Sequence, residues 1–239
     1  MAETNTSGPV IGVATEKGPK RPLNADAHAH HQFHDRLAVA IVDGTGSTPE
    51  VAEFAQLAAA TAVRIAARRT PVRGVMIAAE LCEDPAVEHP APSGTIVVAT
   101  MLPNGESLVA WAGDAAAYGY DPEKQEVTRL TTPHTQGQML REEGLSDEEA
   151  RKYDNVITNS LARASYHGVE SFVTHRPLLI LASDGIHRLT DSELTDIVRE
   201  HSGDPEMCAQ QIVKAGREKS RDDITVLVVP HPHPKTERG

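Results

Sequence analysis

Short runs of apolar residues, rich in valine, isoleucine, leucine and alanine, recur along the chain and predict buried β-strands. These runs are Val10–Ala14, Leu37–Val42, Thr95–Leu102, Ser107–Ala112, Leu178–Ala182 and Ile224–Val229. Two further segments, Ala115–Tyr120 and Glu126–Leu130, continue a meander after the fourth run. Asn104-Gly105, between two of the apolar runs, indicates a tight hairpin.

Helical patterns stand between these groups of strands. Residues 49–68 place their apolar side chains on one stripe, and residues 72–83 predict a second helix. Capping boxes begin helices at Ser146 and Thr190, and Asp204-Pro205 begins another. Because the helices come in pairs between meandering strands, the pattern favours an α+β fold, with antiparallel sheets or a sandwich flanked by helices, over an alternating βαβ fold.

The composition is that of a globular protein with a marked acidic excess. The 239 residues include 23 Lys and Arg against 34 Asp and Glu, a formal charge of −11, and only 3% are aromatic. This balance argues against nucleic acid or an anionic membrane as a partner. The N-terminus has no signal-peptide pattern, no apolar run is long enough to span a membrane, and Cys82 and Cys208 form no disulfide framework. We therefore expect a cytoplasmic protein.

Aspartates stand at the ends of the predicted strands. Asp-Gly is a common turn pair, and turn formation alone can explain any single one of them. Carboxylates at the edge of a buried sheet are costly unless something compensates them, so several together suggest convergence on hard cations. Oxygen ligands suit Mg²⁺ or Mn²⁺ rather than zinc. The aspartates concerned are Asp26, Asp43, Asp114, Asp184 and the Asp222-Asp223 pair.

Seven segments follow one another along the chain: RPLNAD, VDGTGS, SGTIVVATMLPNGESLVAWAGDAAAYGY, LTTPHTQGQMLREEGLSDEEA, NVITNSLARA, LASDGIHRLTDSEL and SRDDITVLVV. In this order they resemble the metal-dependent serine/threonine protein phosphatases of type 2C, the PPM family, in a compact bacterial form. The resemblance extends from about Gly12 to Val229. It implies one phosphatase domain over residues 1–239, with a core of about 10–230. It also implies a β-sandwich of two mostly antiparallel sheets, with helices on both outer faces.

The resemblance also implies a site for two Mn²⁺ or Mg²⁺ ions. Asp43 corresponds to the carboxylate that bridges both ions and takes part directly in the reaction, and the Gly44 carbonyl binds one ion. Asp184 and Asp222 correspond to the other direct ligands of the first ion, and Asp26 to an aspartate that holds metal-bound water. A water activated between the two ions would then hydrolyse phosphoserine or phosphothreonine.

Other positions bear on the substrate and on departures from the family. Arg21 stands where the family clamps the substrate phosphate, and it is expected to bind substrate and to act in catalysis. Asp114 matches a ligand of a third metal ion, but Arg188 stands where an acid usually completes that site and would repel the ion. Ala25 replaces a usual Glu or Gln, and Thr45 stands where animal members have a histidine.

Three further segments carry expectations. Residues 134–165 resemble the family's flap, a mobile segment beside the cleft. Residues 1–8 and 231–239 are expected to be flexible ends because of their composition. His28 and His30 would share one face of a strand, and a solvated segment near the cleft explains them better than a zinc site.

Three functions remain open from the sequence. The leading one is a protein phosphatase acting on a phosphorylated protein, in opposition to a serine/threonine kinase. The second is a catalytically weak or inactive pseudophosphatase that binds phosphoproteins as a regulatory module, an interpretation that Ala25, Thr45 and Arg188 favour. The third is a metallophosphatase for a small phosphorylated metabolite. Metal-dependent phosphate release distinguishes the first from the second, and substrate profiling distinguishes the first from the third.

Overall fold

Two five-stranded antiparallel sheets form the centre of the molecule, in a computed structural model that describes residues 10–83 and 92–234. Sheet A has the order β1 (Gly12–Glu16), β10 (Ile224–Pro230), β9 (Leu178–Ala182), β6 (Ala116–Asp121), β7 (Glu126–Arg129). Sheet B has the order β2 (Asp26–Phe33), β3 (Arg36–Gly44), β4 (Gly94–Met101), β5 (Ser107–Ala112), β8 (Glu170–Thr174). Every strand pairing within the described residues is antiparallel.

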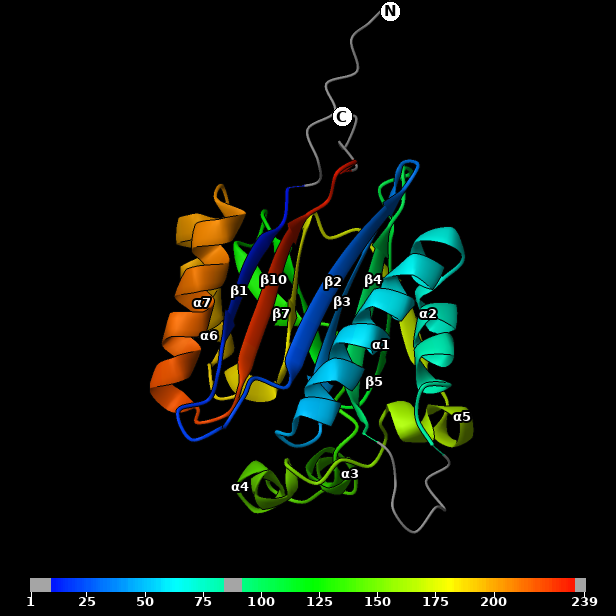
Figure 1. The fold of residues 1–239 in the computed structure, drawn as a ribbon. Helices are drawn as coiled ribbons and strands as arrows, with labels where there is room; N and C mark the ends of the chain where they lie inside the picture. The colour runs from blue at the N-terminus through cyan, green and yellow to red at the C-terminus, as the bar shows by residue number, and fades with distance from the viewer. Residues whose placement is uncertain (1–9, 84–91, 235–239) are drawn as a thin grey trace, which may run out of the picture.

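Helices cover both outer faces of the sandwich (Figure 1). α1 (Pro49–Arg68) and α2 (Pro71–Ala79) pack on sheet B, while α6 (Asp191–His201) and α7 (Pro205–Lys219) pack on sheet A. The short helices α3 (Gln136–Glu142), α4 (Asp147–Ala150) and α5 (Ala164–His167) lie at one end of the sheets. Three 3₁₀ turns complete the described helices: Arg151–Tyr153, Leu161–Arg163 and Asp184–Ile186.

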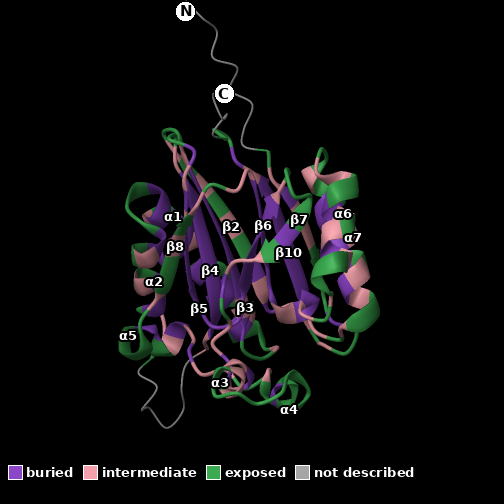
Figure 2. Cartoon of the chain, turned by 180° about the vertical axis from the view of Figure 1, so that it is seen from behind, coloured by how far each residue is buried: buried purple, intermediate pink, exposed green. Residues whose placement is uncertain are grey.

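Three apolar layers hold these elements together. Strand β9 contributes Leu179 and Leu181 to the layer between the sheets and Ile180 to the layer under α6 and α7. Because both faces of such a strand are buried, its sequence is an unbroken apolar run and does not alternate with polar residues. Figure 2 shows the buried sheets between helices whose outer sides are exposed.

Alanine explains how a chain with few aromatic residues fills its core. Helix α1 buries Ala55, Ala58, Ala62 and Ala66, which pack in the layer that also contains Ala38 and Ala40 of β3. Small side chains on both elements allow helix and sheet to approach closely, so dense packing does not require large residues. None of the helices in the described ranges has the length and apolar character needed to cross a membrane.

The predicted α+β sandwich with helices on both outer faces is confirmed, and the differences concern edges and ends. Strand β8 was not predicted, and β2 was expected only as a solvated segment around His28 and His30. Both lie at the edges of sheet B, where one side remains exposed and the apolar pattern is weak. The second helix ends at Ala79, earlier than the predicted Glu83.

The predicted flexible ends fall mostly outside the described residues. Residues 1–9 and 235–239 are not described. His231 is 6% exposed, its N–H donates to the Pro177 carbonyl at 2.8 Å, and its ring contacts the Glu106 carbonyl at 3.2 Å. The ordered fold therefore extends at least to His231, which the sequence placed in the flexible tail.

Candidate active site

Carboxylates from both sheets meet at one end of the sandwich. Asp26 opens β2 and is the register partner of Asp43 at the end of β3. The next pair in the ladder, Ala27 and Val42, packs toward the helices, so the two aspartates face sheet A. From sheet A, the Asp184 N–H donates to Asp43 Oδ2 at 3.3 Å. The two sheets thus present their acids to each other.

Ser183 ties this junction together. Its hydroxyl donates to Asp26 Oδ2 at 2.7 Å, and Ser183 Oγ accepts the Thr225 N–H at 2.9 Å. Ser183 is fully buried at the end of β9 and thereby links β9, β10 and β2. The separation of the sheets at this end is therefore fixed by hydrogen bonds as well as by apolar packing.

Arg21 and Asp222 form the second part of the site. Asp222 precedes β10, and the Arg21 guanidinium donates to its carboxylate. The two side chains are 33% and 40% exposed, so a solute can reach them. Burial alone would lower the pKa of Arg21, but the Asp222, Asp223 and Asp43 carboxylates raise it above its usual range. Arg21 therefore remains a cation at the edge of the acidic cluster.

Asp114 reaches the site from the turn between β5 and β6. Gly113 takes φ +110° there, and an added Cβ would lie 2.2 Å from the Thr95 side chain, so this crossover between the sheets requires glycine. Arg129 donates to the Asp114 carbonyl at 3.0 Å. His187 lies half-buried beside them, and burial of its ring together with the Arg129 charge lowers its pKa to about 3. The Arg129 guanidinium therefore places a positive charge next to Asp114.

Burial and mutual repulsion shape the electrostatics of the cluster. Burial raises the pKa of Asp26 to about 7, against the hydrogen bonds of Ser183 and Thr225. Burial, followed by the charges of neighbouring aspartates, raises the pKa of Asp43 and of Asp184 well above the ordinary range. Burial also raises the pKa of Asp114. Carboxylates placed in this way favour the arrival of positive charge.

The donor set fits hard divalent cations. Carboxylate and carbonyl oxygens are the ligands that Mg²⁺ and Mn²⁺ prefer, and a divalent charge offsets the repulsion that raises these pKa values. Within the described residues, no three His, Cys, Asp or Glu side chains are grouped closely enough in this structure to hold a metal ion.

The remaining predicted positions lie around this cluster. Gly44 ends β3, and its N–H donates to the Ala25 carbonyl at 3.2 Å. Ala25 is 2% exposed, so this position supplies packing and no carboxylate. Thr45 and Arg188 are exposed.

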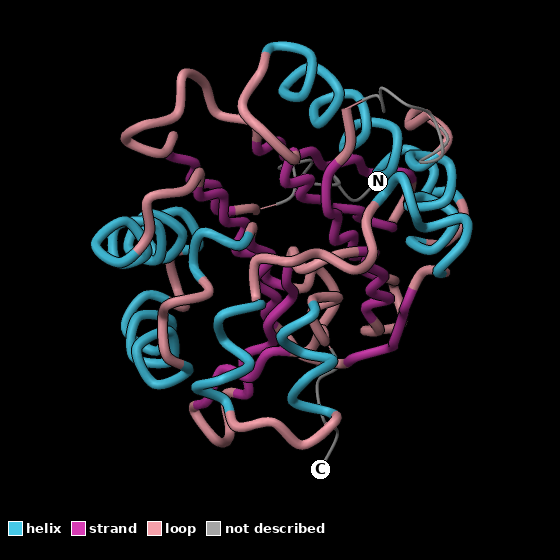
Figure 3. The backbone as a smooth tube through the Cα atoms, turned by 90° about the horizontal axis from the view of Figure 1, so that it is seen from below, coloured by secondary structure: helices cyan, strands magenta, loops and turns pink. Residues whose placement is uncertain are grey.

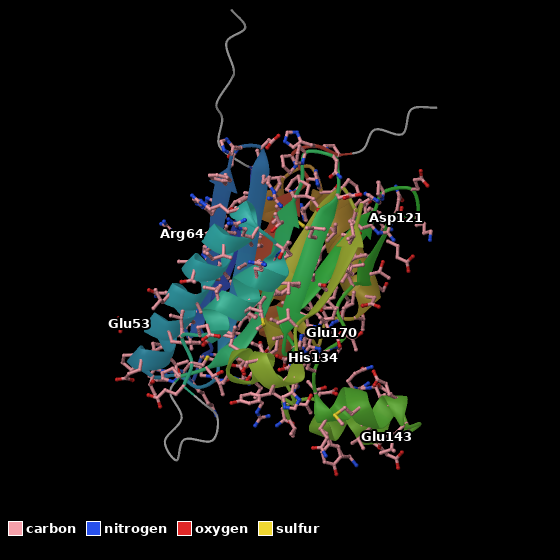
Figure 4. The ribbon with its side chains drawn as sticks, turned by 90° about the vertical axis from the view of Figure 1, so that its right-hand side faces the viewer. Glu53, Arg64, Asp121, His134, Glu143 and Glu170 are labelled. Carbon is pink, nitrogen blue, oxygen red and sulfur yellow. The ribbon has the colours of Figure 1, made fainter. Side chains whose placement is uncertain are left out.

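Of the predicted flap, residues 134–165, helices α3 and α4 lie beyond this end of the sheets, while Leu161 and Ala164 pack in the apolar layer between sheet B and its helices. Arg141 joins the flap helices through two bonds to the Asp154 carboxylate, at 2.6 and 2.8 Å, and a third to Asp147 at 2.8 Å. Figure 3 views the molecule from this end, with the strands between the helix layers. At its base, His134 Nδ1 accepts the Gly113 N–H at 3.0 Å, and His134 Nε2 lies 3.3 Å from Glu170 (Figure 4). The flap is thus attached next to Asp114.

A separate groove of about 540 Å³ lies between β1 and α7. Val13, Lys214 and Arg217 are among its lining residues, and it contains none of the clustered aspartates. The acidic cluster, rather than this groove, holds the residues suited to chemistry.

Comparisons with known proteins agree with the fold. No family model matches the chain. It is 28% identical to a serine/threonine phosphatase of Listeria welshimeri over 143 residues, which are 57% of this chain and 56% of the relative, and 27% identical to one from Listeria monocytogenes over the same share. The match spans little more than half the length of these curated relatives.

Solved structures match over nearly the whole chain. The serine/threonine phosphatase Stp1 of Staphylococcus aureus is 17% identical with a TM-score of 0.77, covering 94% of this chain and 95% of its own. The PPM phosphatase MsPP of Mycobacterium smegmatis is 22% identical with a TM-score of 0.71, covering 92% and 97%. This is the PPM phosphatase fold. The resemblance expected from the sequence is therefore confirmed.

Within this PPM fold, sequence reasoning identified the acids but missed their supports. Ser183, Arg129 and Arg217 carry hydrogen bonds to the site or to its loops. Ser183 directly precedes Asp184, and Arg217 lies in the last turn of α7, five residues before Asp222. Their closeness in sequence to predicted site residues was therefore a signal that they could support the site. Arg129 offered none, because its contact with Asp114 depends on how β6 and β7 pair.

Proposed function

We propose that this chain hydrolyses phosphoserine or phosphothreonine in proteins, with two Mn²⁺ or Mg²⁺ ions as cofactors. The observation that carries the proposal is the meeting of Asp26, Asp43, Asp184 and Asp222 from both sheets beside the Arg21 guanidinium. The names of the curated relatives and the shared fold support the same reaction class. Phosphoproteins made by a serine/threonine kinase are the proposed substrates.

Different residues of the chain would hold the ions and the water bound to them. Asp43, Asp184, Asp222 and the Gly44 carbonyl would hold the ions, and Asp26 would hold water bound to them. When bound, two such ions acidify a water molecule and neutralise charge on the phosphoryl oxygens. Because Arg129 already places positive charge behind Asp114, we expect no tightly held third ion there.

Arg21 would bind the phosphate. A guanidinium offers two parallel donors that match two phosphoryl oxygens, and its partial exposure leaves it accessible from solvent. One structural neighbour, the Mycobacterium smegmatis phosphatase, was solved in complex with cacodylate. Cacodylate is a tetrahedral oxyanion, and a site of this kind in the present chain would accept a phosphoryl group of the same shape.

A phosphoprotein-binding module without turnover is the second candidate. The observation that favours it is the buried Ala25, which adds no carboxylate beside Asp26. In that case the site binds phosphate and an ion but releases no product.

The deciding experiment measures phosphate release from a phosphothreonine peptide during a Mn²⁺ titration and again in EDTA. Release that rises with Mn²⁺ and disappears in EDTA supports the enzyme. Peptide binding without release supports the binding module. Comparison with small phosphorylated metabolites then shows whether protein substrates are preferred.

Replacing Arg21 with Ala should raise the KM for the phosphopeptide by roughly tenfold to a hundredfold, because a charge-assisted contact to phosphate is lost. Arg21→Lys should recover only part of the loss, since an ammonium cannot make the two parallel bonds. Lys20→Ala is the matched control, because Lys20 is an exposed neighbouring cation with no role in the proposal. A KM equal to that of the wild type in Arg21→Ala would remove Arg21 from the site.

A further inference from the structure

One buried carboxylate holds both ends of the loop that carries Arg21. Oδ1 of Asp223 accepts the Gly18 N–H at 2.7 Å, and Oδ2 accepts the Ala25 N–H at 2.9 Å. Asp223 is 4% exposed and directly precedes β10. The two ends of loop 18–25 are therefore fixed to one side chain of sheet A.

Close backbone packing strengthens this attachment. An added Cβ at Gly18 would lie 2.6 Å from the Arg221 carbonyl oxygen, so the loop rests directly on the segment before Asp223. Within the loop, the Arg21 N–H donates to the Gly18 carbonyl at 3.1 Å. The position of Gly18 thus determines where the Arg21 backbone lies.

Arg217 supports the same junction from outside. Its guanidinium donates to the Glu16 carbonyl at 2.9 Å and to the Asp222 carbonyl at 2.8 Å. It therefore joins the end of β1, where the Arg21 loop begins, to the segment that carries Asp222. The Arg21–Asp222 pair stands on two segments that are cross-linked on both sides.

We infer that Asp223 is a positioning residue that places the Arg21 guanidinium for phosphate binding. This inference rests on the proposed function of Arg21. The geometry requires a carboxylate, because two backbone N–H groups approach the two oxygens of one side chain. An asparagine can accept only one of them and would turn its own NH₂ donors toward the other. Asp223 is thereby assigned to the loop and not to a metal ion.

The test compares Asp223→Ala and Asp223→Asn with the wild type in the presence of Mn²⁺. In Asp223→Ala we expect faster hydrogen–deuterium exchange in residues 18–25, about tenfold weaker binding of inorganic phosphate and a KM raised by about the same factor, because a displaced guanidinium loses its alignment. kcat should change less than KM. Asp223→Asn should lie between Asp223→Ala and the wild type.

A double mutant separates positioning from general structure. If Asp223 acts through Arg21, then Asp223→Ala added to Arg21→Ala should weaken phosphate binding no further. Asp121→Asn is the matched control. Asp121 lies at the end of strand β6 and forms an ion pair with Arg176, so its replacement removes a charged partner and should lower stability without changing phosphate binding. Additive losses in the double mutant, or unchanged exchange in residues 18–25, would overturn the inference.

Exchange and phosphate binding do not require turnover, so the two proposals fail separately. If the wild type releases no phosphate from the peptide, the proposal that this chain hydrolyses phosphoserine or phosphothreonine is refuted. In that protein, faster exchange and weaker phosphate binding in Asp223→Ala would still establish the positioning role. Unchanged values would reject it whether or not the protein is an active enzyme.

Discussion

Asp43→Asn is expected to lower kcat by about a thousandfold or more while the protein stays folded. Asp43 lies at the centre of the carboxylate cluster, opposite Asp26 in the ladder and bonded to the Asp184 N–H. Its amide analogue keeps the shape but loses the charge that holds cations. Without metal, the same change should raise the free energy of unfolding, because it removes the repulsion from Asp26 and Asp184 that contributes to the raised pKa of Asp43.

The measurement pairs activity with thermal unfolding in EDTA. We expect a gain on the order of 1 kcal/mol for metal-free Asp43→Asn, which corresponds to roughly 2–4 °C in Tm for a chain of this size. Asp196→Asn is the control, because Asp196 pairs with Arg199 on the exposed side of α6 and belongs to no acidic cluster. Full activity in Asp43→Asn would refute the assignment of Asp43 as a metal ligand.

The layers of the fold could be predicted from the sequence because burial leaves a clear pattern. Strands buried on both faces, such as β9, give unbroken apolar runs, and α1 shows one apolar stripe. Edge strands give a weaker signal: β2 alternates Ala with His over residues 27–30 and then continues with His31 and Gln32, and β8 exposes Val173. The pairing of β8 depends on β5, far away in the chain, which a local pattern does not encode, whereas β2 forms a hairpin with the adjacent β3.

The candidate site could be predicted in part, for a related reason. Acids directly after apolar strands mark the end of a sheet, so Asp43, Asp184 and Asp114 were visible in the sequence. Their supports were not identified, since Ser183 and Asp223 act through contacts between elements distant in sequence and the contact of Arg129 depends on how β6 and β7 pair. In the sequence, Asp223 stood with Asp222 among the acids that suggest a cation site, and only the folded loop shows its two backbone partners.

The metal-free protein should lose stability as the pH rises above about 6.5, and Mn²⁺ should restore it. The folded pKa of Asp26 is about 7, above its ordinary value of 3.8. A group whose pKa is raised by folding contributes stability at low pH, and that contribution is lost as the pH passes through the folded pKa. Asp43 and Asp184 have the same sign of shift. Folding lowers the pKa of His187, so this group makes the folded protein more stable as the pH rises. That gain in stability is complete once the unfolded histidine, with an ordinary pKa of 6.5, is neutral.

From about pH 6.5 to about pH 8, we therefore expect deprotonation of Asp26 alone to cost the metal-free protein roughly 1 kcal/mol, or about 2–4 °C in Tm, and deprotonation of Asp43 and Asp184 to add to the loss. An ion that binds only the folded state at a hundred times its Kd restores about 2.7 kcal/mol. The loss should be smaller in Asp26→Asn, which keeps every histidine, so the difference between the two proteins isolates the carboxyl. If the Tm in EDTA rises over this pH range in the wild type, or falls equally in both proteins, then the raised pKa of Asp26 does not determine the pH dependence of stability. Because Mn²⁺ competes with protons for the same oxygens, its stabilising effect should grow with pH.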